Sequence, residues 1–167
     1  MVKNKYSGSV NDFQLVVEDQ SRIVVSYGLE VGENDMATWY EVVFYKKQQG
    51  KPTIAQVKAA IMEDINNRVK DKIISGFVYN EQPVWLSEEN QMNFAQAVVP
   101  TTFKTGEQED GTPIYNEFNT KKDLQQFVEA CVRWKQECLS WGWTEKDSID
   151  WAPYEQALEA LTPETAE

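Results

Sequence analysis

An amphipathic stretch that runs directly into a compact hairpin pattern constrains the fold of this chain more than any other feature. Residues 53–74 carry apolar side chains three and four positions apart, which predicts a helix with one apolar face. That face is formed by Ile54, Val57, Ile61, Ile65, Val69 and Ile73. Thr53 and Gln56 have the spacing of a capping box, so the helix is expected to begin at Thr53. Gly76 is expected to end it.

The segment that follows predicts a short hairpin and a second helix. Residues 77–79 and 84–86 are β-prone runs on either side of the turn sequence at residues 80–83, with Trp85 in or beside the core. Ser87 is a favourable N-cap, and the two glutamates after it stabilise the positive end of a helix. This helix is expected to extend to about Val98, because Pro100 cannot continue it.

The first 50 residues predict an antiparallel sheet. Residues 13–17 and 23–27 alternate apolar and polar side chains on either side of a turn at residues 18–21, which is typical of a hairpin. Residues 28–37 are rich in turn formers and predict a loop, and residues 38–45 have strong β propensity. Only three strands are evident, so the edges of this sheet are expected to need a partner or a cover.

Two more strands and a long helix are predicted in the C-terminal half. The strands are expected at residues 101–104 and 114–118, with an acidic loop at residues 105–113 between them. Thr120 is placed to cap the helix, and Gly142 is expected to end it. The apolar face of this helix is formed by Leu124, Phe127, Cys131, Trp134, Cys138 and Trp141.

These elements together predict an α+β fold. An N-terminal antiparallel sheet is followed by a helix, a hairpin, a helix, a strand pair and a long C-terminal helix. A chain of 167 residues fits one domain, or a small domain with an appendage. The predicted organisation is an N-terminal β region at 1–50, an α+β domain at 51–161 and a frayed tail at 162–167.

The charge balance and the lack of histidine restrict the classes of function. The chain has 27 Asp and Glu against 16 Lys and Arg, a net charge of −11, and no basic run that could form a nucleic-acid groove. No nucleic acid and no membrane are therefore expected as partners. Histidine, the most common general base and metal ligand, is absent. The chain is predicted not to be an enzyme and to need no metal or cofactor.

The remaining reactive side chains are predicted to have structural roles. Cys131 and Cys138 share a helix face roughly 10 Å apart along the axis, too far for a disulfide, and are expected to be reduced, buried and unreactive. The acidic segment at residues 107–111 lacks the ligand register of a calcium loop, so a solvated loop is expected. The side chains of Glu88 and Glu89 point about 100° apart on a helix, so they are not expected to act as a pair of catalytic carboxylates. They are expected instead to stabilise the positive end of the helix.

Aromatic residues are concentrated near the C-terminus, where Trp134 begins a tryptophan-rich stretch. Two interpretations remain open. The rings fill the core where a helix crosses the sheet, or they are exposed anchors in a protein interface. Under the second interpretation, the predicted partner-binding residues are Trp141, Trp143, Trp151 and Tyr154.

The stretch from Ile54 to Trp151 resembles a phage-borne domain family without an assigned function. The shared pattern is an amphipathic helix, a short hairpin with a phenylalanine, an acidic helix start, an asparagine before an apolar residue, a strand pair and a closing helix. The matching pieces are residues 65–73, 76–80, 85–90, 93–94, Phe103, Phe118 and 124–127. Residues 73–94 resemble the versions in prophages of gut bacteria more closely than the general family pattern.

This family occurs in tail-region and tail-fibre-assembly-associated proteins of phages and prophages. The resemblance implies a bacteriophage structural or assembly protein, such as a tail or tail-fibre component or its chaperone. Such a protein binds phage structural proteins, forms a homo-oligomer or a multicopy subunit, and resides in the virion after assembly in the bacterial host cytoplasm. The alternative is an acidic DNA mimic or host-takeover protein that binds a basic host enzyme. A DNA mimic needs its carboxylates in a regular track that resembles the phosphates of DNA. Lysines and arginines are interleaved with the acidic residues of this chain, which disfavours such a track.

Overall fold

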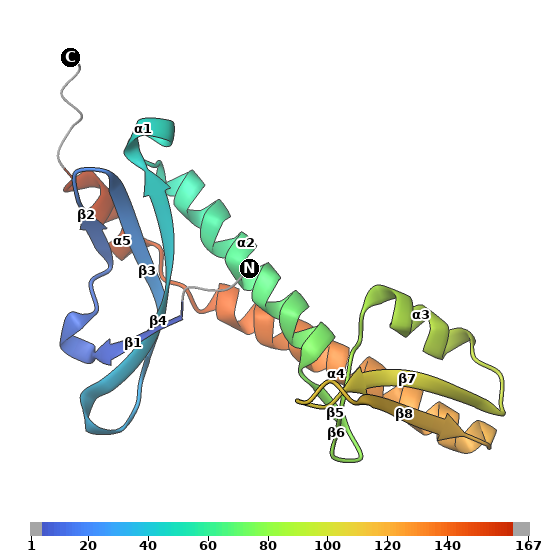
Figure 1. Ribbon diagram of the computed structural model, residues 1–167. Coiled ribbons are helices and arrows are strands. Elements are labelled where there is room, and N and C mark those ends of the chain that lie inside the picture. Colours follow the sequence, from blue (N-terminus) through green and yellow to red (C-terminus); the bar gives the residue numbers. More distant parts are fainter. Residues whose placement is uncertain (1–4, 162–167) are drawn as a thin grey trace. The chain divides into compact units, whose positions relative to one another are not determined.

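The computed structural model describes residues 5–161, which form two compact units (Figure 1). Unit 1 contains the described residues up to Ile65 and from Glu145 onward, and unit 2 is residues 66–144. The order of elements confirms the predicted α+β fold. The tail predicted to fray, residues 162–167, lies outside the described residues.

Unit 1 contains a four-stranded antiparallel sheet with the order β1-β4-β3-β2. Its elements are β1 (Lys5–Ser9), η1 (Val10–Asp12), β2 (Val16–Glu18), β3 (Arg22–Val31), η2 (Glu33–Asp35) and β4 (Met36–Tyr45). The prediction of three strands is wrong by one. Strand β1 has no apolar alternation that would reveal it, and it forms by pairing with β4.

The prediction of a loop over residues 28–37 is also wrong, because β3 bulges and then continues. The register of β3 against β4 shifts between Tyr27 and Glu30, as expected of a β-bulge. Gly28 lies in this bulge with a φ of 65°, a left-handed conformation that favours glycine. The connection between the two strands is therefore shortened to residues 32–35.

The remaining elements follow the predicted order closely. They are α1 (Lys46–Gln49), α2 (Ile54–Ser75), β5 (Phe77–Tyr79), β6 (Gln82–Val84), α3 (Glu88–Gln96), β7 (Thr101–Glu107), β8 (Pro113–Phe118), α4 (Lys121–Asp147) and α5 (Ala152–Glu159). All three predicted helix caps are confirmed. The hydroxyl of Thr53 accepts from Gln56 N at 3.3 Å, that of Ser87 accepts from Asn90 N at 3.2 Å, and Thr120 caps α4 in the same way.

Helix α2 supplies buried side chains to both units. Its predicted apolar face is confirmed for Val57, Ile61, Ile65, Val69 and Ile73, all of which are buried. The first three belong to unit 1 and the last two to unit 2. One continuous apolar stripe therefore contributes to two cores.

The core of unit 1 lies on one face of the sheet. Ile23 pairs with Phe44 and Val25 with Val42, and all four side chains are buried on that face. Helix α5 belongs to the same unit and buries Tyr154 and Leu158. The predicted division at residue 50 does not coincide with the compact units, because α5 belongs to the same unit as the N-terminal sheet.

Hydrogen bonds from tyrosine hydroxyls connect helices to the sheet within unit 1. Tyr27 donates its hydroxyl proton to the carboxylate of Asp64 on α2, and Tyr154 donates to Ser26 O at 3.1 Å.

The core of unit 2 is an aromatic cluster centred on Phe127, which is fully buried. Its ring centroid lies 4.9 Å from that of Tyr79, 5.0 Å from that of Phe94 and 4.9 Å from that of Phe118. These partners come from β5, α3 and β8, so one ring on α4 contacts three other elements of this unit. Aromatic pairs at these separations add to the stability that burial alone provides.

The hairpin of β5 and β6 confirms its predicted turn and corrects the position of Trp85. Asn80 and Glu81 form an exposed turn with positive φ. Trp85 is 40% exposed, whereas Val84 and Leu86 on either side are fully buried. Because side chains alternate along extended backbone, burying these two neighbours directs Trp85 outward.

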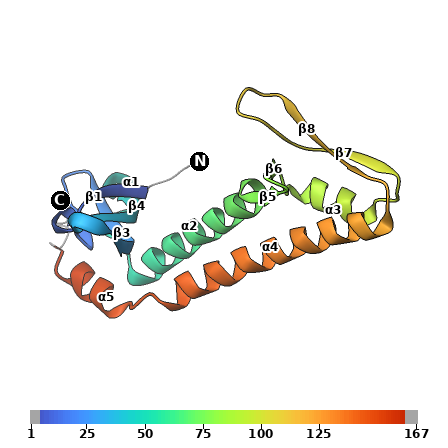
Figure 2. The same cartoon turned by 90° about the horizontal axis from the view of Figure 1, so that it is seen from below.

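The prediction that Gly142 ends the last long helix is wrong, since α4 continues to Asp147. Gly142 is a buried position within the helix, and a Cβ built there would overlap the side chain of Val69 on α2. The glycine therefore permits a close approach of two helices within unit 2, where α2 and α4 run side by side (Figures 1 and 2).

Truncation of either central isoleucine of α2 is expected to destabilise the protein strongly. Ile61 is 0% and Ile65 1% exposed, so Ile61→Ala or Ile65→Ala should each cost about 2–5 kcal/mol in the free energy of unfolding. Urea denaturation monitored by circular dichroism measures this quantity. As a control, Val132→Ala alters a helical side chain that is 49% exposed and should change it by less than about 0.5 kcal/mol. A parent-like stability of Ile65→Ala would contradict a central role for α2.

Replacement of Gly142 by alanine is expected to destabilise the protein, although alanine has a higher helix propensity than glycine. In an exposed helix, Gly→Ala stabilises by about 1 kcal/mol. Here the overlap with Val69 should make Gly142→Ala destabilising by about 1–3 kcal/mol in urea denaturation. The double variant Gly142→Ala with Val69→Ala should lose less than the sum of the two single changes, because it removes the overlap. A stabilising Gly142→Ala would show that the helices do not approach closely at this point.

Candidate functional site

The four predicted partner-binding aromatics are divided between the two units. Trp141 and Trp143 belong to unit 2, and Trp151 and Tyr154 belong to unit 1. Trp143 is 59% exposed and Tyr154 is buried. The predicted partner contact stays a prediction for the tryptophans, whereas the buried position of Tyr154 argues against a direct contact by that ring.

Trp141 is partly covered by basic side chains of α2. The guanidinium carbon of Arg68 lies 5.2 Å from the centroid of the Trp141 ring, and Lys72 Nζ lies 4.8 Å from it. Trp134 joins the same cluster, since its indole N–H donates to Lys72 O at 3.2 Å. Cations above an indole face are attracted by its quadrupole. These two tryptophans thus have partners within unit 2, while Trp143 exposes most of its ring.

Trp151 and Tyr154 pack at the start of α5. Their ring centroids are 5.5 Å apart, and Lys58 Nζ lies 5.5 Å from the centroid of Trp151. The ammonium of Lys58 also pairs with Glu155 at 3.4 Å. Burial raises the pKa of the Tyr154 hydroxyl to about 12. Because this group is protonated at neutral pH, it serves as a hydrogen-bond donor to the sheet.

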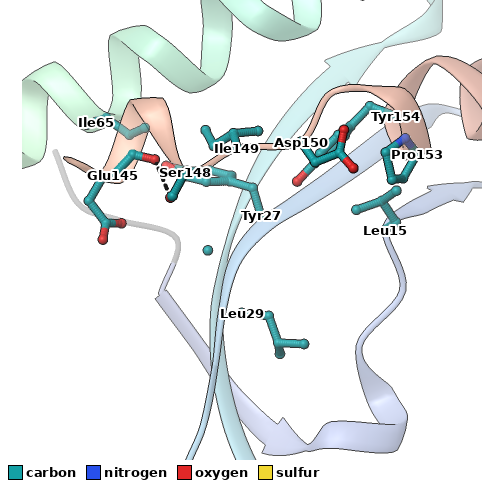
Figure 3. Close-up of a pocket in the computed structure, with 11 residues that line it drawn as sticks. Leu15, Tyr27, Leu29, Ile65, Glu145, Ser148, Ile149, Asp150, Pro153 and Tyr154 are labelled. Atoms are coloured by element: carbon teal, nitrogen blue, oxygen red, sulfur yellow. Dashed lines mark hydrogen bonds between the residues drawn. The ribbon is translucent and has the colours of Figure 1, made fainter. Parts of the chain in front are cut away.

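A pocket opens in unit 1 between the sheet and the connection from α4 to α5 (Figure 3). Its volume is about 310 Å³, and its walls come from four separate segments of the chain. The lining residues are Leu15, Tyr27, Gly28, Leu29, Ile65, Glu145, Ser148, Ile149, Asp150, Pro153 and Tyr154. Most of them are apolar, and none carries a positive charge.

The charged groups of this pocket lie in the last turn of α4, which carries Glu145, and on the connection to α5, which carries Asp150. Glu145 is half-buried and Asp150 is exposed. One oxygen of Asp150 accepts from Ala152 N at 3.1 Å, and the hydroxyl of Ser148 donates to Glu145 O at 2.8 Å. Neither carboxylate is in an ion pair within the part of the chain that the structure describes. The pocket therefore offers two negative charges above an apolar floor.

Sequence reasoning missed this pocket. Glu145, Ser148 and Asp150 are ordinary polar residues at a helix end, and Leu29 was expected in a loop. No local motif connects these positions, because the pocket forms only when α5 returns to the sheet. The one usable signal is Gly28, since a glycine within a β pattern marks a bulge.

A second hollow lies at the end of the β3–β4 hairpin. It has a volume of about 330 Å³ and is lined by Ser7, Glu30, Val31, Gly32, Met36, Ala37 and Thr38. Val31 is 59% and Met36 52% exposed there. We refer to Leu29, Val31 and Met36 as the apolar hairpin end. Met36 pairs with Ser9 of β1, which is an edge strand of the sheet.

The acidic side chains of the predicted turns are held by hydrogen bonds, and the two cysteine thiols are buried. Asp19 accepts from Ser21 N at 2.7 Å, and this hydrogen bond holds the pKa of the carboxyl below its usual range. Asp110 accepts from Thr112 N at 2.9 Å in the acidic turn after β7, which likewise lowers its pKa. Both cysteines are free and buried, as predicted, and burial raises the pKa of Cys131 to about 12. None of these groups is set up as a nucleophile or general base.

Within residues 5–161, no group of three or more acidic or cysteine side chains is arranged to hold a metal ion. In the same span, no helix has both the length and the apolarity to cross a bilayer.

Comparison with known protein families identifies the family of the chain. The sequence profile of DUF4376, described as a domain of unknown function, matches residues 56–165. No significant match is found among curated proteins or among solved structures. The matched range begins in α2 and includes every later element of the described chain.

Removal of the Tyr154 hydroxyl is expected to weaken unit 1. Tyr154→Phe loses the hydrogen bond to Ser26 O and should cost about 0.5–1.5 kcal/mol at neutral pH. The raised pKa adds a pH dependence. The unfolded phenol ionises near its usual value of 10.0 and the folded one near 12, so stability should fall between these values. That portion of the fall should be absent in Tyr154→Phe. Urea denaturation from pH 8 to 11 tests both effects, with Tyr115→Phe, at a ring 62% exposed, as the control.

Proposed function

Since the chain belongs to the DUF4376 family of domains of unknown function, we propose a role for it as a bacteriophage structural or assembly protein that works by binding other proteins. It serves as a tail or tail-fibre component, or as the chaperone that assembles one. Its partners are phage structural proteins, and it resides in the virion after assembly in the bacterial host cytoplasm. The phage assignment is supported by the resemblance of residues 54–151 to tail-region proteins of phages and prophages.

The apolar hairpin end is the observation that carries a protein-binding role. Val31 and Met36 expose more than half of their surface beside a hollow in the sheet. Methionine and aromatic side chains are enriched at the centres of protein interfaces. Because these side chains are already about half buried, their full burial by a partner contributes roughly 1–2 kcal/mol each.

The edge strand beside this surface offers a second means of attachment. Strand β1 pairs with β4 on one side and has no strand on its other side among the described residues. An open edge presents backbone donors and acceptors that a strand of another protein can pair with. Side-chain burial at the hairpin end and backbone pairing along β1 together suit a multicopy or homo-oligomeric subunit.

Trp143 supports an additional contact in unit 2. It is exposed on α4, and tryptophan is among the residues that contribute most to binding energy when a partner buries them. Trp143 therefore provides a contact for a partner in unit 2, in addition to the contact at the apolar hairpin end of unit 1.

The proposed function is tested with the phage that encodes the chain. Mass spectrometry of purified particles should detect the protein if it is a virion component. If it is a chaperone, affinity purification from infected lysate should instead recover a tail or fibre protein. Recovery of only a basic host enzyme would favour the DNA-mimic or host-takeover alternative. Absence from particles, together with no phage structural protein in the lysate complex, would overturn the proposal.

Substitution of the apolar hairpin end should separate binding from folding. Val31→Glu and Met36→Glu are each expected to reduce recovery of the phage partner by about tenfold, since each introduces a charge into the buried contact. Both side chains are exposed, so the melting temperature should change little. Val98→Glu is the matched control, because Val98 is 77% exposed and lies in unit 2. Equal recovery of all three variants would place the contact elsewhere.

A further inference from the structure

We propose that the pocket of unit 1 receives an arginine side chain from the partner protein. The pocket is the one in Figure 3, between β3 and the connection from α4 to α5. This inference rests on the proposed function in that the arginine belongs to a bound protein. It adds the chemical identity of the group that enters the pocket.

Charge complementarity indicates a cation. Glu145 and Asp150 carry the two charges of the lining, and no lining residue is basic. Asp150 uses one oxygen to accept from Ala152 N, which holds the carboxylate in place, and its other oxygen can accept from a ligand. A guanidinium presents five donors in a planar fork and pairs well with carboxylates.

The apolar floor and the volume indicate a long side chain rather than a bare ion. Leu29 and Ile149 provide surface that the aliphatic stem of arginine can cover. A volume of about 310 Å³ lies at the lower end of the range of roughly 300–1,000 Å³ for small-molecule sites. One extended basic side chain therefore suits the pocket better than a large ligand.

Continuity with the apolar hairpin end points to a protein as the source of this side chain. Leu29 lines the pocket, and the next two residues of β3, Glu30 and Val31, line the hollow at the hairpin end. A partner that buries Val31 is thus positioned to insert a neighbouring side chain past Leu29. A free amine in solution would make no use of this adjoining surface.

Binding is tested by nuclear magnetic resonance on the full chain labelled with ¹⁵N. The probe is N-acetyl-arginine N-methylamide, and its control is the citrulline analogue, which has nearly the same shape without the charge. The arginine probe should produce saturable shifts of the amides of Gly28, Leu29 and Ile149, with a dissociation constant in the millimolar range. The citrulline probe should produce none.

Two variants and a matched control test whether the carboxylates of Glu145 and Asp150 bind the arginine probe. Glu145→Gln and Asp150→Asn should each weaken binding of the arginine probe by about tenfold, as expected for loss of a charge-assisted hydrogen bond. Asp150→Asn keeps an oxygen to accept from Ala152 N, so the local fold is preserved. Glu33→Gln removes an exposed charge at the turn between β3 and β4 and should leave the affinity unchanged.

The outcomes are distinguishable. Equal binding of citrulline, no saturable shift at the three pocket amides, or unchanged affinity in both pocket variants would overturn the arginine site. Putrescine that binds at least tenfold more tightly than the arginine probe would assign the pocket to a free amine and also overturn it. Loss of the arginine site leaves the proposed phage role intact. Conversely, absence from phage assemblies removes that role without affecting binding of the probe.

Discussion

The apolar face of α2 is the constraint on which the rest of the structure depends. Five of its side chains are buried, and they are shared between the cores of the two units. Ile61 and Ile65 lie in unit 1, whose sheet also buries Tyr154 of α5, while Val69 and Ile73 lie in unit 2. Because burial of one large aliphatic side chain contributes roughly 1.5–3 kcal/mol, this helix supplies a large share of the stability of each unit.

The candidate site depends on how the chain returns to its own beginning. The hydrogen bond from Tyr154 to Ser26 O joins α5 to a strand more than a hundred residues earlier in the sequence. Glu145 at the end of α4 and Asp150 on the connection to α5 line one pocket together with Leu29 of β3. Binding residues commonly lie on such connections, where packed elements hold them and solvent or a partner can reach them. The adjoining hairpin end supplies the apolar surface that a protein partner needs.

Local signals in the sequence were sufficient to predict most helices and strands. They were not sufficient to predict features that depend on contacts between distant segments. The caps at Thr53 and Ser87 and the apolar period of α2 depend only on neighbours within a turn or two, so they could be predicted. Strand β1 could not, because a strand without apolar alternation forms only through its partner β4. Gly142 resembles a helix end in sequence, yet its role is a close contact with Val69, far away along the chain. The pocket was unpredictable for the same reason.

By itself, the sequence determined the α+β class, the order of the elements and the identity of the buried faces, because these follow from side-chain period and turn chemistry along the chain. The tertiary structure alone decided which aromatics are exposed. Trp143 remains at the surface while Tyr154 is buried, although both lie in the same aromatic-rich segment. It also decided that two ordinary carboxylates share a pocket with Leu29. Burial and pocket formation depend on contacts between distant segments, and no local pattern encodes those contacts.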